Sequence, residues 1–257
     1  MTITDALKQA GIENAAQEAA WIAKYHNGQL SIDEIVRRRC NGEPLQYLLG
    51  EWEFCGYPFK VGKGVLIPRP ETELLVDLAK PFNCDVFDLC AGSGCVGIAL
   101  TKQTKRNVMA VEKSPEAVAY LQQNITLNGV ERCVQIFQND IFDPDLLMVV
   151  NQVLSLITCP AAILINPPYL SKDEILSLQK EVRHEPMTAL FGGGDGLDFF
   201  RTFFDVWADT LNRVKLFACE VGIGQADQVS RMMQDIGLSP QIKQDYNKID
   251  RIVYSIK

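Results

Sequence analysis

Residues 85–97 read Asp85-Val86-Phe87-Asp88-Leu89-Cys90-Ala91-Gly92-Ser93-Gly94-Cys95-Val96-Gly97. The first five form a short apolar run typical of a buried strand, and Cys95 begins a helix that extends to Lys102. Gly92 and Gly94 lie between the two, where a tight turn needs backbone without a bulky side chain. A strand, a glycine-rich turn and a helix in this order predict an α/β unit whose turn lies beside a ligand.

The chain beyond this unit keeps alternating between strand and helix. Further strands are expected at residues 107–111, 134–137, 161–165, 215–219, 241–244 and 251–256, and further helices at 115–127, 197–211 and 226–236. This alternation is typical of a mainly parallel sheet with helices on both faces, so the fold class is α/β and Rossmann-like. The last two strands have no helix between them, which suggests an antiparallel edge.

The first fifty residues predict short helices. Thr4 is expected to cap the first, residues 15–25 form the second, and a capping box at Ser31 and Glu34 opens the third. Residues 44–49 predict a fourth. Such short helices are unstable alone, so we expect them to pack as a small bundle.

The composition of the sequence changes after these helices. Residues 51–68 mix aromatic and branched residues with glycine and proline, which is typical of a hairpin or extended linker. We therefore predict three parts: a helical domain over 1–50, a hairpin linker over 51–68, and an α/β domain over 69–257.

Composition excludes several function classes. Apolar residues make up 47% of the 257, and the formal net charge is −7. An acidic chain is a poor non-specific binder of DNA, whose phosphates need a basic face. The eight cysteines form no C-x-x-C pair and the chain has two histidines, so we expect reduced thiols in a cytoplasmic protein and no zinc site.

One stretch is long enough to suggest a membrane span. Residues 146–165 are twenty in a row without a charge. Pro160 and several polar residues interrupt the run, so we interpret it as an apolar helix, a break, and a buried strand at 161–165. No membrane association is expected.

The glycine-rich turn has an acidic partner. Glu112 ends the second expected strand, where a carboxylate can accept hydrogen bonds from ribose hydroxyls. The same spacing fits a nicotinamide enzyme, so the turn by itself does not identify the ligand. Asp140, with apolar Ile141 beside it, follows the third strand and is placed to contact an adenine ring.

The motif Asn166-Pro167-Pro168-Tyr169 directly follows the strand at 161–165 and is the most informative piece of the sequence. A planar amide or amino nitrogen carries two N–H groups and needs two acceptors to be oriented. The Asn166 side-chain oxygen and the Pro167 carbonyl can supply them, and the rigid prolines pre-aim that carbonyl. The Tyr169 ring can pack on the planar group. This arrangement predicts catalysis by positioning a nitrogen against a sulfonium methyl group.

The chain resembles the release factor glutamine methyltransferase family, also called protein N5-glutamine methyltransferases, along nearly its whole length. The matching pieces are residues 44–50, 65–73, 88–94 and 166–169, and a further match from Glu185-Pro186 through Ala189-Leu190, Gly193 and 195–197 to Phe199. The run Pro68-Arg69-Pro70-Glu71-Thr72-Glu73 is the most discriminating. Cys90 stands where many members have glycine, and Ile141 where an aromatic residue is common.

The resemblance implies a class I methyltransferase domain of seven strands that uses S-adenosylmethionine and releases S-adenosylhomocysteine. The substrate would be the glutamine of the Gly-Gly-Gln motif in class-one peptide-chain release factors, recognised by the N-terminal helices. The implied substrate-binding residues are Asn166, Pro167, Pro168 and Tyr169, of which Asn166, Pro167 and Tyr169 are catalytic. The implied cofactor contacts are Cys90, Ala91, Gly92, Ser93, Gly94, Glu112, Asp140, Ile141 and Asn166, with Arg69 and Thr72 in the same pocket. A monomer without direct nucleic-acid specificity is expected.

Other functions stay open at this stage. A ribosomal protein could supply the glutamine, and adenine methylation of DNA or RNA uses the same Asn-Pro-Pro-Tyr chemistry but needs a basic groove and a flipped base. A nicotinamide dehydrogenase has no use for that motif. A binding module that has lost turnover is disfavoured by the intact Asn166 and Gly92.

Overall fold

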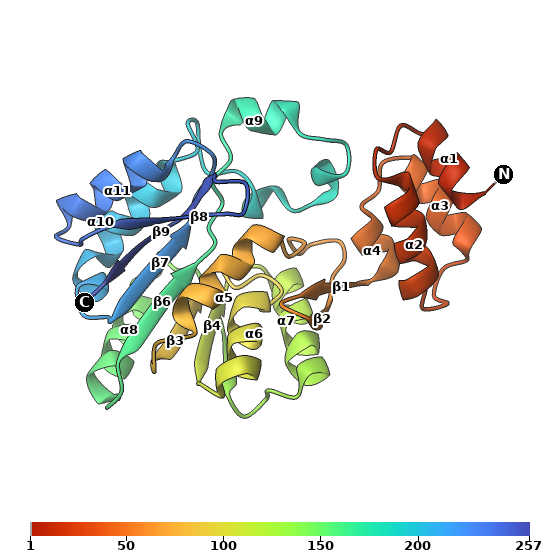
Figure 1. Cartoon of the computed structure of the whole chain (residues 1–257). Helices are drawn as coiled ribbons and strands as arrows, with labels where there is room; N and C mark the ends of the chain where they lie inside the picture. Colours follow the sequence, from red (N-terminus) through yellow and green to blue (C-terminus); the bar gives the residue numbers. More distant parts are fainter. Residues whose placement is uncertain (1) are drawn as a thin grey trace.

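The computed structural model describes residues 2–257, and one seven-stranded sheet forms its centre (Figure 1). Across the sheet the strands lie in the order β5-β4-β3-β6-β7-β9-β8. Their bounds are β3 Asp85–Leu89, β4 Val108–Glu112, β5 Val134–Gln138, β6 Ala161–Ile165, β7 Leu216–Glu220, β8 Gln241–Gln244 and β9 Asp250–Ile256. The strands from β3 to β7 are parallel, and β9 is antiparallel to β7 and β8. The predicted fold class and antiparallel edge are confirmed.

Helices cover both faces of the sheet. One buried cluster joins it to α5 Glu73–Ala79, α6 Cys95–Thr104 and α7 Pro115–Asn128, and a second joins it to α8 Pro144–Leu156, α10 Asp198–Leu211 and α11 Ala226–Asp235. Successive side chains of β3 point to opposite faces of the sheet, which explains why there are two clusters. Val86 packs in the first cluster, whereas Phe87 and Leu89 pack in the second. The uncharged stretch of residues 146–165 lies in the helix α8 and the strand β6, as predicted. No helix within residues 2–257 is long and apolar enough to cross a membrane.

The N-terminal helices pack around their own buried cluster, apart from the sheet (Figure 1). They are α1 Ile3–Gln9, α2 Ala15–Tyr25, α3 Ile32–Cys40 and α4 Leu45–Leu49. The hairpin of β1 Glu51–Phe54 and β2 Tyr57–Lys60 follows and touches both sides. Its Trp52 ring meets Trp21 edge-on with centroids 5.1 Å apart. Its Lys60 backbone exchanges hydrogen bonds of 2.6 and 3.1 Å with the Asn124 side chain on α7.

One predicted helix cap and one predicted capping box need correction. The first helix begins at Ile3, and the hydroxyl of Thr2, not of Thr4, accepts the Asp5 N–H at 3.1 Å. Ser31 caps the third helix as predicted, but the reciprocal half of its capping box is not formed. The Glu34 carboxylate binds Arg37 instead, at 2.6 and 2.9 Å, because a guanidinium one turn away offers a charged double donor.

The segment between β6 and α10 contains elements that the sequence analysis did not predict. It holds α9 Lys172–Ser177 and the 3₁₀ turns η2 Val182–His184 and η3 Met187–Ala189. Ser171 and Glu174 form a complete capping box at the start of α9. This signature was present in the sequence, but the helix buries none of its side chains and therefore has no apolar periodicity.

The junction of β3 and α6 is closed by Asp88 and Gly97. The Asp88 carboxylate is buried and accepts the Gly97 N–H at 2.9 Å. A Cβ on Gly97 would lie 2.7 Å from Val108 Cγ1 and 2.9 Å from Asp88 Oδ2, so only glycine fits there. Burial raises the pKa of Asp88 from 3.8 to about 7 against the lowering effect of this hydrogen bond.

This pKa predicts how stability depends on pH. Between about pH 4 and 7 the unfolded chain releases the Asp88 proton while the folded chain keeps it, so the free energy of unfolding falls as pH rises. Asp88→Asn cannot ionise at this position. We therefore expect the fall in its free energy of unfolding with rising pH to be smaller than in the wild type, by roughly 2–4 kcal/mol. Urea unfolding of both proteins from pH 4.5 to 8 measures it, with Asp85→Asn at the part-exposed start of the same strand as control. Parallel pH curves for wild type and Asp88→Asn would contradict the assignment.

Candidate functional site

The glycine-rich turn leaves open space at the carboxyl end of β3. Cys90, Gly92 and Gly94 all have positive φ angles, of 56°, 56° and 80°. The left-handed conformation of Cys90 is one that glycine adopts without strain. A Cβ on Gly94 would lie 2.2 Å from the Leu121 side chain, whereas one on Gly92 would meet no described atom within 4 Å. Gly94 therefore permits packing against α7, and Gly92 lies beside free space.

Glu112 lies next to that space, at the end of β4. Its Oε2 accepts the Gly92 N–H at 2.8 Å, and its Oε1 accepts the Ser114 N–H at 2.8 Å. Each carboxylate oxygen has a further lone pair, so Glu112 can still accept hydrogen bonds from two hydroxyls of a ligand. The acid that was predicted from spacing is thus held against the glycine turn.

Asp140 and Ile141 follow β5 on the same edge of the sheet. Asp140 Oδ2 accepts from Lys113 Nζ at 2.6 Å, and its Oδ1 accepts the Phe142 N–H at 3.0 Å. The Ile141 side chain is buried, and its carbonyl accepts the Trp207 indole N–H at 3.0 Å. Both residues are therefore anchored at the end of the third parallel strand, one strand beyond Glu112.

The Asn-Pro-Pro-Tyr motif follows β6 and lines a cavity of about 170 Å³. The cavity is lined by Leu66, Arg69, Asn166, Tyr169, Leu170, Val182, Ala189 and Leu190. Asn166 Nδ2 donates to the Thr72 hydroxyl at 3.1 Å, and the Tyr169 hydroxyl donates to Glu220 Oε1 at 3.1 Å. One planar amide and one aromatic ring therefore share a small cavity at the carboxyl edge, next to the glycine turn on β3.

Glu220 contacts two of the predicted site residues, Thr72 and Tyr169, and was not predicted from the sequence. It ends β7, the neighbour of β6, and it is 1% exposed. Burial raises its pKa, while hydrogen bonds from Thr72 at 2.6 Å and from Tyr169 lower it. Its position after a buried strand matches that of Glu112, so the rule that ligands bind at the carboxyl ends of parallel strands could have identified it.

Arg69 and Thr72 come from the 3₁₀ turn η1 Pro70–Thr72 and its approach. The Arg69 guanidinium pairs with the buried Glu185 carboxylate, whose other oxygen accepts the Ile67 N–H at 3.0 Å. The structure thus gives Arg69 and Thr72 protein partners, namely Glu185 for the first, and Asn166 with Glu220 for the second. Their predicted contact with a cofactor stays a prediction.

A second loop closes over the motif. A Cβ on Gly192 would lie 2.7 Å from the Pro168 carbonyl oxygen, and one on Gly196 would lie 2.4 Å from the Tyr169 carbonyl oxygen. The Gln225 amide also donates to the Tyr169 carbonyl, at 2.8 Å. Glycines let the two backbones approach closely, which fixes the shape of the motif from outside.

The N-terminal bundle contacts the loop beside this cavity. Arg39 on α3 is buried, bonds Glu18 at 2.7 and 2.9 Å, and pairs with Glu181 at 2.6 Å. Glu181 directly precedes Val182, which lines the cavity. Helices from the start of the chain and a loop from its second half therefore meet beside the site.

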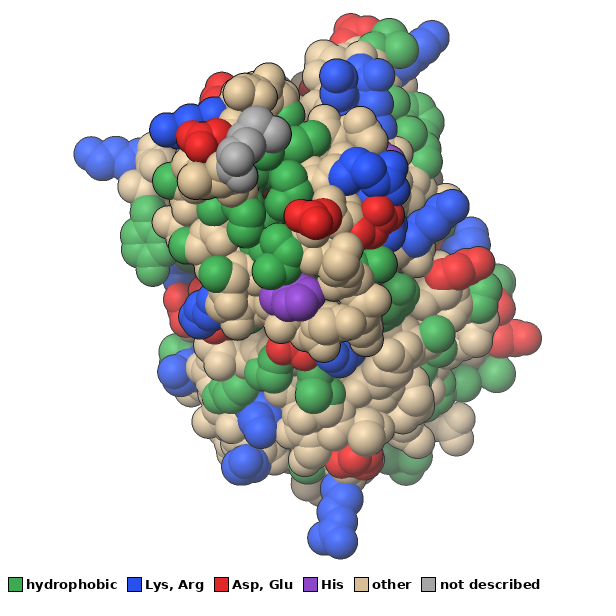
Figure 2. All heavy atoms as spheres, turned by 90° about the vertical axis from the view of Figure 1, so that its right-hand side faces the viewer, with side chains coloured by type: hydrophobic (Ala, Val, Ile, Leu, Met, Phe, Trp, Pro, Cys, Tyr) green, Lys and Arg blue, Asp and Glu red, His purple; other side chains and the backbone are tan. Residues whose placement is uncertain are grey.

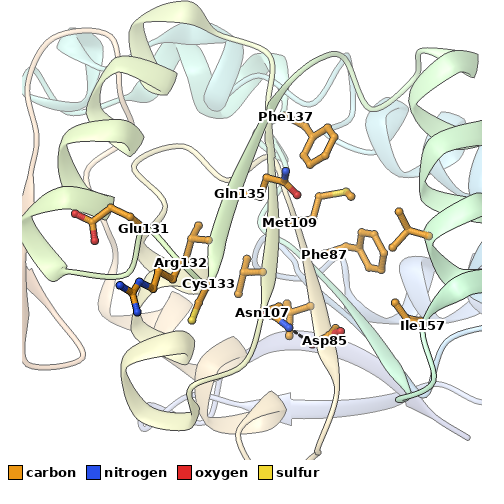
Figure 3. Close-up of a pocket in the computed structure, with 14 residues that line it drawn as sticks. Asp85, Phe87, Asn107, Met109, Glu131, Arg132, Cys133, Gln135, Phe137 and Ile157 are labelled. Carbon is orange, nitrogen blue, oxygen red and sulfur yellow. Dashed lines mark hydrogen bonds between the residues drawn. The ribbon is translucent and has the colours of Figure 1, made fainter.

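A larger cavity of about 430 Å³ lies at the opposite end of the strands (Figure 3). Phe87 and Met109 point from β3 and β4 into it, and Ile157 follows α8 at its far side. Two of its lining residues are joined by a hydrogen bond, which Asn107 donates to Asp85 at 3.3 Å. None of the residues predicted for the site lines this cavity, whereas Arg69, Asn166 and Tyr169 line the smaller one.

Other chemistry is limited within residues 2–257. No group of three or more His, Cys, Asp and Glu side chains there is arranged to hold a metal ion. All eight cysteines are free thiols. Burial raises the pKa of the Cys90 thiol well above its ordinary value, so Cys90 stays protonated and is a weak nucleophile.

Solved structures of low identity match the fold. The catalytic domain of human METTL16 superposes with a TM-score of 0.64 at 12% identity, covering 94% of this chain and 91% of its own. The N-terminal domain of human METTL16 in complex with SAH superposes with a TM-score of 0.58 at 14% identity, covering 94% and 93%. At such identities the likeness shows the fold alone, that of a class I methyltransferase.

Relatives with similar sequences show which family the chain belongs to. A family model described as the TRM5/TYW2 methyltransferase domain matches residues 71–163. The release factor glutamine methyltransferase of Geobacter sulfurreducens is 38% identical over 271 residues, covering 96% of this chain and 91% of its own. That of Thermodesulfovibrio yellowstonii is 36% identical over 233 residues, covering 87% and 80%. With this identity over almost the whole length, and with the methyltransferase fold above, the chain belongs to the release factor glutamine methyltransferase family.

Proposed function

We propose that the protein transfers the methyl group of S-adenosylmethionine to the side-chain amide nitrogen of the glutamine in the Gly-Gly-Gln motif of class-one release factors. The observation that supports this most is the small cavity of Asn166 and Tyr169, at the strand ends beside the glycine turn. Its size suits a single extended side chain. Its lining supplies an amide oxygen and an aromatic face for a planar group.

The residues around the glycine turn fit S-adenosylmethionine. Open space at Gly92 leaves room for the ligand, and Glu112 keeps acceptor capacity for ribose hydroxyls. We assign its binding to Cys90, Ala91, Gly92, Ser93, Gly94 and Glu112, with Asp140 and Ile141 at the adenine end. Arg69, Thr72 and Asn166 border the methyl end. When bound, the cofactor supplies an electrophilic methyl group on a sulfonium, and S-adenosylhomocysteine is the product.

Positioning by Asn166, Pro167 and Tyr169 is the main task of the protein. The Asn166 side-chain oxygen and the Pro167 carbonyl each accept one N–H of the substrate amide, which aims its nitrogen. Pro167 and Pro168 restrict the backbone, and Gly192 packs against it from outside, so the carbonyl keeps its direction. The Tyr169 ring packs on the amide plane and excludes water from the reacting nitrogen.

We assign recognition of the release factor to the helical domain of residues 1–50, joined through the linker 51–68 to the catalytic domain of residues 69–257. Figure 2 looks onto the face that carries the N-terminal helices, where acidic, basic and hydrophobic side chains lie intermingled. A mixed face of this kind suits a folded protein partner better than a nucleic acid, which selects a continuous basic surface. We propose a monomer that works in the cytoplasm, where release factors act.

Methyl transfer to purified proteins tests the substrate. Labelled S-adenosylmethionine is supplied with a release factor, with its Gly-Gly-Gln→Gly-Gly-Ala variant, and with duplex DNA. Label on the unmodified factor alone is expected, because the reacting nitrogen belongs to that glutamine. Label on DNA would support adenine methylation instead, and label on the alanine variant would move the reaction to another residue.

Removing the Asn166 amide tests the positioning role. We expect Asn166→Ala to lower kcat roughly a hundredfold or more, since one pre-aimed acceptor is lost. The dissociation constant for S-adenosylmethionine should change much less. Steady-state kinetics and calorimetry measure the two quantities. An equal loss of turnover and cofactor affinity would show that Asn166 serves the cofactor and not the substrate.

Filling the space at Gly92 tests the cofactor site. Gly92→Val places a branched side chain in the open space and forces it into a left-handed backbone, so cofactor binding should be lost. Gly237→Val is the matched control, because Gly237 has a φ of 85° and also faces open space, on the loop after α11. Cofactor affinity measured by calorimetry should survive only in the control; unchanged affinity in Gly92→Val would refute the site.

A further inference from the structure

Two buried polar groups form a hydrogen-bonded chain behind Asn166. The Asn166 Nδ2 lies 3.1 Å from Thr72 Oγ1, which lies 2.6 Å from Glu220 Oε2. Thr72 is 2% exposed and Glu220 is 1% exposed. The chain runs from the turn η1 and the end of β7 to the loop after β6, so two distant parts of the sequence hold one amide.

The direction of these hydrogen bonds follows from the chemistry of the groups. When Glu220 is ionised its carboxylate can only accept, so the Thr72 hydroxyl donates its proton to Oε2. The Thr72 oxygen is then available to Asn166 only as an acceptor. Asn166 consequently turns its NH₂ towards Thr72 and its Oδ1 away from it. The reversed amide would place two lone pairs face to face inside the protein, which is unfavourable.

The same carboxylate also holds the aromatic ring of the site. Glu220 Oε1 accepts from the Tyr169 hydroxyl at 3.1 Å while Oε2 accepts from Thr72. One buried side chain thus sets both the amide and the ring that line the cavity. Burial raises the Glu220 pKa, and the hydrogen bonds from these two donors oppose that rise.

We propose that Thr72 and Glu220 are positioning residues that lock the Asn166 amide with its oxygen towards the substrate nitrogen. This rests on the proposed function, in which Asn166 accepts an N–H of the glutamine. Without the lock the amide can present its NH₂ group to the substrate, which repels the two N–H groups that it should bind. Thr72 borders the methyl end of the cofactor, but its hydroxyl is engaged by Glu220 and Asn166, so we assign that hydroxyl to substrate orientation.

The decisive variant is Thr72→Val, which keeps the shape of the side chain and removes the hydroxyl. We expect kcat for release factor methylation at pH 8 to fall about tenfold to a hundredfold, because a misoriented acceptor costs catalysis without unfolding the site. The dissociation constant for S-adenosylmethionine should stay within about twofold. Thr72→Ser keeps the hydroxyl and should restore most of the turnover. Unchanged kcat in Thr72→Val, or a loss of cofactor affinity that matches the loss of kcat, would overturn the proposal.

A matched control lies on α10. The Thr210 hydroxyl is buried and pairs with the Asn151 side chain, at 3.0 and 3.2 Å, far from the cavity. Thr210→Val therefore removes the same kind of threonine–asparagine contact, and should leave kcat within about twofold. If it lowers kcat as much as Thr72→Val does, the effect is a general loss of stability and the proposal fails.

Two further variants separate the effect of the Thr72–Glu220 chain from the role of Asn166 itself. In an Asn166→Ala background the lock has nothing to hold, so adding Thr72→Val should lower kcat no further. Glu220→Gln offers either an oxygen or an NH₂ to Thr72, so it should lower kcat several-fold even if Thr72→Val folds poorly. Equal effects of Thr72→Val in both backgrounds, or full activity of Glu220→Gln, would overturn the lock. Full activity of Asn166→Ala would instead refute the proposed function itself.

Discussion

The close approach of α6 to β3 at Gly97 is the contact on which the rest of the structure depends. No Cβ fits there, because Val108 on the next strand and the Asp88 carboxylate already occupy the space. The Gly97 N–H is satisfied by Asp88 inside the protein, so the helix begins directly over the strand end. The turn between them is thereby held open at Gly92, and Glu112 comes within hydrogen-bond distance of it.

Parallel pairing aligns the ends of the neighbouring strands with the turn after β3. β3 lies between β4 and β6 in register, so the ends of these strands fall on one edge. Glu112 ends β4 and Asn166 follows β6, and they therefore lie on either side of the turn after β3. The order of the strands reverses direction at this point, which is where open α/β sheets bind ligands. At the other end of the strands, the larger cavity is lined by none of the residues that directly follow β4 and β6.

Burial then changes what the polar groups at this edge can do. Glu220 and Thr72 are almost inaccessible to water, so each must find its hydrogen-bond partner within the protein. Their bonds reach Asn166 and Tyr169, which line the small cavity. The glycine loop around Gly192 covers the same motif from the other side. A site built from weak, neutral groups gains its precision from this surrounding network, which suits a reaction that needs orientation more than acid or base.

Local patterns in the sequence determined the strands, most helices and the glycine turn, because apolar periodicity and capping depend on neighbours only a few residues apart. The same patterns placed Asn166 and Glu112 at strand ends. They missed α9, which buries no side chain, and they assigned the cap of the first helix to Thr4 although Thr2 makes it. Only the tertiary structure decided the hydrogen-bonded chain that holds Asn166, since its members Thr72 and Glu220 are separated from Asn166 by 94 and 54 residues of sequence. Burial and pairing across such distances leave no periodic signal in a single sequence.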